Sequence, residues 1–155
     1  MVVPPDNMAL ASSGARIAMA TSEHPKHPPE LVLDGNLKTF WMSTGLFPQE
    51  FVVTFPTQIT VSKIIVSSMK VAQWNVEASK TDKPSSFEPL GDQAMEDTDN
   101  VIQTLSLAPK EPVVARHLRF EIARGFGPFV SVHRVVVYGE RGVAEAKNVP
   151  QAAES

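Results

Sequence analysis

Hydrophobic and polar residues alternate over short stretches of this chain, which is the pattern of half-buried β-strands rather than of helices. In residues 115–123, for example, Leu118, Phe120 and Ile122 share one face of a predicted strand. The stretches that we predict as strands are residues 15–20, 50–55, 59–67, 71–78, 101–107, 115–123 and 130–138. About seven or eight short strands at this spacing predict an all-β antiparallel sandwich or jelly roll.

Prolines and a change of phase define the ends and irregularities of these strands. The chain has 13 prolines and 8 glycines, which leave little room for long helices. We predict that Pro56 ends the strand 50–55. In the following strand the hydrophobic positions change phase near Lys63 and Ile64, which indicates a β-bulge.

The chain is long enough for one domain, which we place at residues 1–140. Residues 141–155 are rich in Ala and Glu, and we predict that they form a disordered C-terminal tail. Within the domain, residues 79–100 are polar and acidic. They are predicted to form a long connection with a short strand around Phe87.

Charge and composition exclude several classes of function. The formal net charge is −3 and the charges are interspersed, so nucleic acid is not an expected partner. The chain has no cysteine, which excludes disulfides, thiolate catalysis and cysteine-rich zinc sites, and which fits a reducing compartment. The first residues make a poor signal peptide, and no apolar run reaches about 18 residues. We therefore expect no membrane insertion.

No motif of a common enzyme class is present in the chain. A nucleophile elbow, a P-loop, a zinc-protease motif and a dinucleotide fingerprint are all absent. The acidic residues Glu96, Asp97 and Asp99 are interpreted as a solvated loop, because nothing apolar near them would raise a carboxyl pKa. We predict that the protein is not an enzyme.

The most specific chemistry lies in residues 34–41, where a carboxylate, a glycine, an amide and a hydroxyl precede Trp41. Calcium prefers oxygen ligands, and Gly35 allows a turn that directs carbonyl groups inward. Asp34 would supply a carboxylate and Thr39 a hydroxyl, with carbonyls from Leu31 and Asn36. An ordinary Asp-Gly turn is the alternative interpretation. The spacing does not fit an EF-hand.

The opening segment and the last strand resemble the discoidin-type domains, the coagulation factor five/eight C-domain family. The resemblance is carried by residues 20–22, 27–36, 39–41 and 135–139. It implies an eight-stranded β jelly roll over about residues 15–140. It also implies a structural Ca²⁺ held by the residues that the loop chemistry indicates, which are Leu31, Asp34, Asn36 and Thr39.

One ligand of the family's calcium site has no counterpart in this chain. Many relatives add a glutamate just before the last strand, where this chain has Arg134. The site would then hold a single carboxylate, from Asp34, which bears on its affinity. We expect an ion that links the early loop to the last strand, with the His133 carbonyl as a further ligand, rather than a calcium sensor.

A second set of residues resembles the intraflagellar transport members of that family. It comprises residues 27–30, 40–41, 44–45, 131–133 and, most specifically, Phe47-Pro48-Gln49-Glu50-Phe51. The resemblance implies a non-enzymatic subunit of intraflagellar transport complex B. It implies a heterodimer with a Rab-like small GTPase subunit, contacts with other complex B subunits, and a location in the cytoplasm and the cilium or flagellum.

Two loops carry aromatic residues that allow more than one interpretation. Residues 46–48 and 125–129 are predicted to be loops with exposed aromatic side chains. We favour core packing or a protein interface for both. The alternative function is a calcium-dependent carbohydrate- or lipid-binding module, in which Phe47, Phe126 and Phe129 would contact the ligand.

Overall fold

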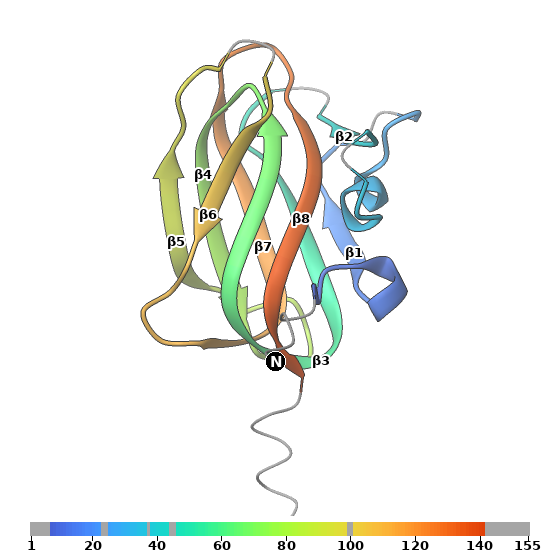
Figure 1. Ribbon diagram of the computed structural model, residues 1–155, viewed down its shortest axis with the longest axis vertical. Coiled ribbons are helices and arrows are strands. Elements are labelled where there is room, and N and C mark those ends of the chain that lie inside the picture. The colour runs from blue at the N-terminus through green and yellow to red at the C-terminus, as the bar shows by residue number, and fades with distance from the viewer. Residues whose placement is uncertain (1–6, 23–24, 37, 44–45, 99–100, 142–155) are drawn as a thin grey trace, which may run out of the picture.

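The longest strand, β3 (Gln49–Met69), takes part in both layers of a β-sandwich in this computed structural model (Figure 1). The structure describes residues 7–22, 25–36, 38–43, 46–98 and 101–141. Within these residues the other strands are β1 (Arg16–Ala20), β2 (Trp41–Met42), β4 (Val71–Ser79), β5 (Glu88–Ala94), β6 (Gln103–Leu107), β7 (Val113–Gly125) and β8 (Ser131–Arg141). Two short 3₁₀ helices are η1 (Ala11–Ser13) and η2 (Pro29–Leu33).

The strand pairings divide the sandwich into two layers. Residues 49–54 of β3 lie between β1 and β7, and β4 and β5 continue that layer in the order β1-β3-β7-β4-β5. Residues 59–69 of β3 pair with β8, and on their other side residues 59–61 pair with β7 and residues 64–68 with β6. Strand β2 pairs with β8. All these pairings are antiparallel. The predicted antiparallel jelly-roll fold is confirmed.

The prediction that Pro56 ends a strand is wrong, because β3 continues through it. Pro56 is exposed, and it lies where the register between β3 and β7 shifts, between Thr54 and Ile59. A proline is tolerated at such an irregularity because no ladder hydrogen bond is lost. The predicted bulge is observed within a residue of its expected place, as a register shift with β8 between Val61 and Lys63.

Two strands differ from the prediction. β5 is seven residues long and pairs with β4, whereas only a short strand around Phe87 was expected. Its residues are exposed or half-buried, so they carry little hydrophobic alternation. β2 was not predicted, because two residues are too few to show a period. Of the predicted tail, residues 141–155, Arg141 is the last residue of β8, and residues 142–155 lie outside the described residues.

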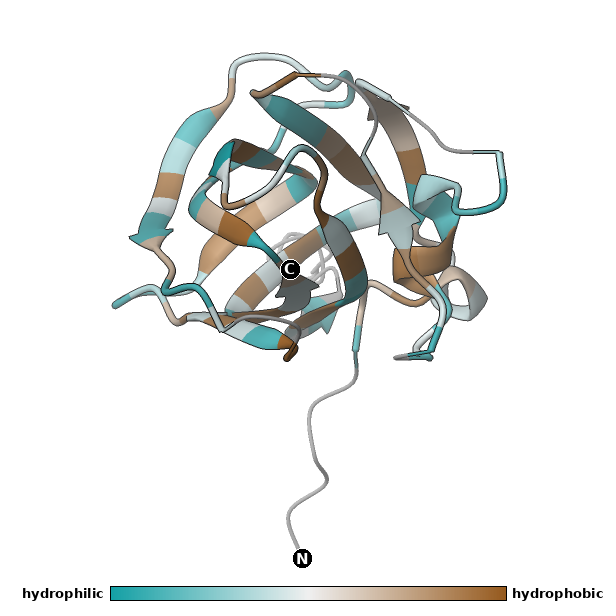
Figure 2. Ribbon diagram, turned by 90° about the horizontal axis from the view of Figure 1, so that it is seen from above, coloured by the Kyte–Doolittle hydropathy of each residue, from teal (hydrophilic) through white to brown (hydrophobic). Residues whose placement is uncertain are grey.

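The space between the layers is filled by large aromatic side chains in contact with each other. Trp41 meets Phe51 edge-on with ring centroids 5.3 Å apart, and Phe51 stacks on Phe120 at 5.1 Å. Phe120 in turn meets Trp74 at 6.3 Å. All four side chains are fully buried. Viewed along the long axis, hydrophobic segments alternate with hydrophilic ones along the strands, as expected for strands with one face in a core (Figure 2).

No helix within the described part of the chain is long and apolar enough to cross a membrane.

Candidate functional site

The loop between η2 and β2 brings together the side chains that the sequence selects as cation ligands. The Thr39 hydroxyl donates to Asp34 Oδ2 at 2.6 Å, and the backbone amide of Asn36 donates to Asp34 Oδ1 at 2.8 Å. Gly35 between them has φ +76°, a conformation that favours glycine. The loop therefore turns back on itself around the Asp34 carboxylate.

Oxygen atoms of all four predicted ligands contribute to this turn. The Leu31 carbonyl accepts a hydrogen bond from the Asp34 amide at 3.4 Å, and the Asn36 carbonyl accepts from the Thr39 hydroxyl at 3.0 Å. Such a donor set suits a hard cation, although an Asp-Gly turn makes the same internal hydrogen bonds. Among the described residues, no three His, Cys, Asp or Glu side chains cluster as metal ligands. Metal binding by this loop stays a prediction.

Stacked rings connect the loop to the last strand. Phe40, next to Thr39, lies parallel to the His27 ring at 4.1 Å and 5.0 Å from the His133 ring of β8. Arg134, for which the resemblance implies the position of the family's glutamate, pairs with Ser67 of β3 and is half-buried. Its Nε is buried with no hydrogen-bond partner among the described residues. The connection between this loop and β8 is thus aromatic in the structure.

Trp41 fixes the other side of the same loop. Its side chain is fully buried, and its indole N–H donates to the Ser22 carbonyl at 2.9 Å. The bond satisfies the one polar atom that the indole carries into the core. Trp41 is therefore a core anchor and is not available to stack on a sugar.

The Phe-Pro-Gln-Glu-Phe segment contains a buried polar connection that sequence reasoning did not assign. Gln49 Oε1 accepts hydrogen bonds from the Thr21 hydroxyl at 2.7 Å and the Ser22 hydroxyl at 2.5 Å. Its amide nitrogen donates to the Leu46 carbonyl at 2.6 Å. One side chain thus joins the end of β1 to the loop before β3. The sequence indicated that this segment is important, but it did not indicate the partners Thr21 and Ser22, because they lie far away along the chain.

Glu50, the next residue, belongs to a charged network on the outer face of the five-stranded layer. Arg119 contacts Glu50 at 2.6 Å and Glu77 at 3.1 Å, and its guanidinium lies 5.8 Å from the centre of the Phe87 ring. Burial opposes the charge of Arg119, but the hydrogen bond that Arg119 donates to the Glu50 carboxylate and the charges of nearby carboxylates outweigh it and raise the pKa of Arg119. The network crosses β3, β7 and β4.

Exposed apolar side chains gather in the loops at one end of the sandwich. We call this group the apolar loop end, and it consists of Leu46, Val101, Ile102, Phe126 and Phe129. The side chain of Leu46 is 89% exposed and that of Phe129 is 51% exposed. Outside this group, the one large hydrophobic side chain exposed among the described residues is Met19.

Hydrogen bonds, an ion pair and a packing contact connect the loops that carry the apolar loop end. The Phe126 amide donates to the Lys70 carbonyl, and Lys70 forms an ion pair with Asp97 at 3.2 Å. The Ser43 amide donates to the Val130 carbonyl. Phe47 is half-buried and packs so closely on Gly125 that a Cβ there would lie 2.5 Å from Phe47 Cζ. Phe47 therefore supports the loops from within.

The sequence model of the F5/8 type C domain family matches residues 17–135. The chain is 35% identical over 133 residues to the intraflagellar transport protein 25 homolog of Homo sapiens, covering 86% of this chain and 92% of the relative. It is 37% identical over 131 residues to intraflagellar transport protein 25 of Chlamydomonas reinhardtii, covering 84% of this chain and 68% of that protein.

Several solved structures with the same fold are carbohydrate-binding modules. The family 32 module from NanJ of C. perfringens, in complex with galactose, has a TM-score of 0.73 and 20% identity, covering 88% of this chain and 99% of the module. Chitosan-binding module 1 from a chitosanase/glucanase of Paenibacillus sp. IK-5 has a TM-score of 0.73 and 19% identity, covering 86% and 98%. Identities this low establish the fold alone.

Proposed function

The chain belongs to the F5/8 type C domain family and, within it, to the intraflagellar transport protein 25 family, and we propose that it is a non-enzymatic assembly subunit that binds a Rab-like small GTPase. Membership in this family gives the chain a role in intraflagellar transport, in the cilium or flagellum. The partner and the surface that binds it are the parts of the function that we add. The apolar loop end is the observation that supports them.

The apolar loop end has the character of a protein interface. Burying one large hydrophobic side chain contributes about 1.5–3 kcal/mol, so Leu46, Phe126 and Phe129 together can supply the centre of a stable contact. The loops that carry them are hydrogen-bonded to each other and to Lys70. A surface that is already ordered loses little conformational entropy on binding.

The charges around this end favour a protein over an anionic membrane. Lys70 is paired with Asp97, and Glu96 and Arg124 add one exposed charge of each sign. Binding to anionic lipid is supported by clusters of basic residues next to the apolar groups. The mixed charges here supply no such excess of basic residues.

Co-expression tests the proposed heterodimer. The full chain and the Rab-like small GTPase subunit of intraflagellar transport complex B should elute together in size-exclusion chromatography at micromolar concentration. Replacing Phe126→Ser together with Phe129→Ser should weaken binding by about 100-fold or more, because both side chains would lie at the centre of the contact. Titration calorimetry measures the change.

Met19→Ser is the matched control for this experiment. Met19 is 41% exposed, close to the 43% of Phe126, but it belongs to β1 and not to the apolar loop end. The Met19→Ser variant should bind the GTPase as tightly as the unmodified chain does. Separate elution of the unmodified chain and the GTPase would refute the heterodimer, and full binding by the double variant would refute the assigned surface.

The loop of residues 31–39 is proposed as a structural calcium site that stabilises the fold. Asp34 would supply the carboxylate, Thr39 its hydroxyl, and Leu31 and Asn36 their carbonyl groups, with water completing the six to eight oxygens that Ca²⁺ takes. The ion would replace the hydrogen bond between Asp34 and Thr39 as the link across the loop. The His133 carbonyl stays a proposed further ligand.

Calcium should raise the melting temperature of the full chain, and Asp34→Ala should abolish that rise. At free calcium about 100 times the dissociation constant, the gain in unfolding free energy is about 2.7 kcal/mol. Asp92→Ala, which removes an exposed carboxylate from β5, should keep the full calcium response. Identical melting curves with chelator and with excess calcium would contradict the proposed site.

The alternative function, a carbohydrate- or lipid-binding module, uses the same exposed aromatic residues. It predicts that the chain binds galactose-containing glycans or vesicles with anionic lipid, and that Phe126→Ser and Phe129→Ser abolish the binding. Phe47 is half-buried against Gly125, so its role would be indirect. Glycan binding without GTPase binding would favour this alternative.

A further inference from the structure

Strand β1 is at the edge of the five-stranded layer and has a hydrogen-bonded neighbour on one side, β3. Along Arg16–Ala20, the described residues supply no backbone hydrogen bond from any segment other than β3. About half of the backbone N–H and C=O groups of an edge strand point away from its neighbour. The outer edge of β1 is therefore open to another extended chain.

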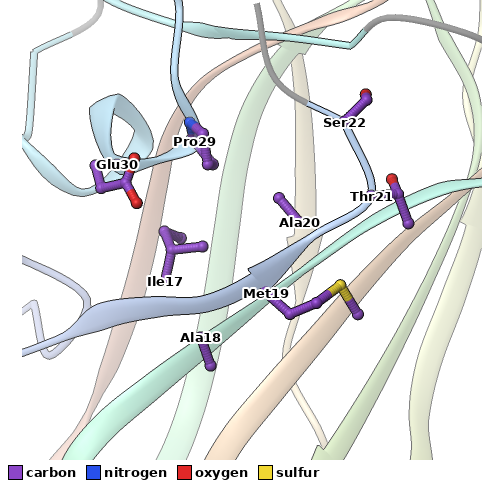
Figure 3. Close-up of a pocket in the computed structure, with 8 residues that line it drawn as sticks. All are labelled: Ile17, Ala18, Met19, Ala20, Thr21, Ser22, Pro29 and Glu30. Carbon is purple, nitrogen blue, oxygen red and sulfur yellow. The ribbon is translucent and has the colours of Figure 1, made fainter.

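A groove follows this open edge (Figure 3). Its volume is about 440 Å³, which is within the usual size range of ligand-binding clefts. Residues 17–22 form one wall, and Pro29 and Glu30 of η2 form the other. Figure 3 shows the Ile17 side chain and the Glu30 carboxylate directed toward each other across it. We call this feature the β1 groove.

The opposite edge of the same layer is protected against strand addition, whereas β1 is not. β5 contains Pro89 and the exposed charges of Glu88 and Asp92, and its register with β4 shifts between Val76 and Glu77. Proline, charge and bulges are the devices by which edge strands avoid pairing. β1 has a bulge at Ala18 and one charged residue, Arg16, at its start. The remaining residues are small or apolar.

The open amides of β1 can be identified from one hydrogen bond. The Thr21 amide donates to the Glu50 carbonyl of β3 at 2.9 Å. Because amides alternate in direction along a strand, the Ala20 amide points to the outer edge, into the groove. The register places Ala20 opposite Phe51 and Ile17 opposite Val53, so both have side chains toward the interior.

Charge defines the occupant further. Glu30 is exposed on the wall of the groove and has no ion pair with another described residue. A lysine or arginine on the incoming segment would meet this carboxylate. Beyond the bulge, Met19 and Ala20 form the regular end of β1, so the new ladder would begin at the outward amide of Ala20.

We propose that the β1 groove binds an extended, Lys- or Arg-containing segment of another subunit of the transport complex, which adds to β1 as an antiparallel strand. Backbone hydrogen bonds give such a contact its affinity, and the side-chain pockets give it specificity. The proposal rests on membership of the transport complex and is independent of GTPase binding.

Hydrogen exchange of the full chain tests the proposal. Exchange would be compared for the chain with the GTPase subunit alone and for the chain within purified intraflagellar transport complex B. In the complete complex, the outward amides within residues 17–22, that of Ala20 among them, should exchange about tenfold more slowly, because strand addition protects them. Unchanged exchange of these amides would overturn the proposal.

Substitutions separate the ladder from other contacts. Ala20→Pro removes an outward amide and should lose the complex, whereas Ala20→Ser keeps the amide and should retain it. Glu30→Lys should also weaken co-purification with the complex, and Glu30→Gln should have an intermediate effect. Because Glu30 is exposed, both of its variants should fold, and they test the proposal even if the proline variant does not fold. The melting temperature of each variant reports folding.

The remaining outcomes also decide the question. If the proline variant folds and co-purifies like the unmodified chain, or if both Glu30 variants do, the strand-addition model is wrong. If the free chain forms a dimer in sedimentation that Ala20→Pro abolishes, the groove pairs with a second copy instead, which likewise overturns the proposal.

Discussion

At the scale of single residues, a few polar side chains attach the loops of this protein to its strands. Gln49 is 4% exposed and makes three hydrogen bonds to other segments. Asp34 and Thr39 form a hydrogen bond with each other that connects the two ends of one loop. The Gln49 connection is part-buried, whereas the Asp34–Thr39 hydrogen bond is exposed.

Gln49→Leu should lower the free energy of unfolding by about 1–3 kcal/mol, because a leucine removes three part-buried hydrogen bonds that the Gln49 side chain makes to Thr21, Ser22 and Leu46. Denaturant unfolding followed by tryptophan fluorescence measures this, since Trp41 and Trp74 are both buried. Gln93→Leu changes an exposed glutamine of β5 and should stay within about 0.5 kcal/mol of the unmodified chain. Equal losses in the two variants would contradict the assigned role.

The sequence predicts local contacts at this scale and misses distant ones. Asp34 and Thr39 are five residues apart, and the chemistry of the loop was enough to select them together. Gln49 and Thr21 are 28 residues apart, and no local pattern relates them. Gln49 was recognised as part of a signature, but its function as a connector depends on the fold.

At the scale of elements, burial decides which strands can be predicted. The strand β7 has Leu118, Phe120 and Ile122 fully buried, and its alternation was clear in the sequence. β5 contributes little to the core, so its residues follow no such alternation. The continuity of β3 through Pro56 was also missed, because a proline at an irregular point in a ladder cannot be distinguished by sequence from one that ends a strand.

Gly139→Ala should destabilise the pairing of β8 with β3. A Cβ at this position would overlap the Thr60 carbonyl oxygen, which is backbone and cannot move without disturbing the ladder. The expected loss is about 1–3 kcal/mol, measured by thermal unfolding. Gly127→Ala is the control, since its Cβ would lie 3.8 Å from the nearest atom, the Phe129 carbonyl oxygen. A stable Gly139 variant would show that β8 tolerates displacement there.

At the scale of the whole molecule, the two proposed surfaces belong to different parts of the sandwich. The apolar loop end is formed by loops, and the β1 groove is formed by a strand edge and η2. Residues of the Phe-Pro-Gln-Glu-Phe segment lie close to both, because Gln49 contacts Thr21 and Ser22 as well as Leu46. The segment that best indicated the family is therefore also the connection between the surfaces.

The passage of β3 through both layers also determines how the molecule loses its structure. Neither layer can release β3 without removing a central strand from the other, so a stable half-unfolded form is not available. We expect one cooperative transition, with calorimetric and van't Hoff enthalpies equal. The partner strands β7 and β8 lie late in the sequence, so β3 cannot complete its pairing until they are available. Folding should therefore be slow for a domain of this size. During synthesis, the edge of β3 that pairs with β8 stays open until β8 emerges.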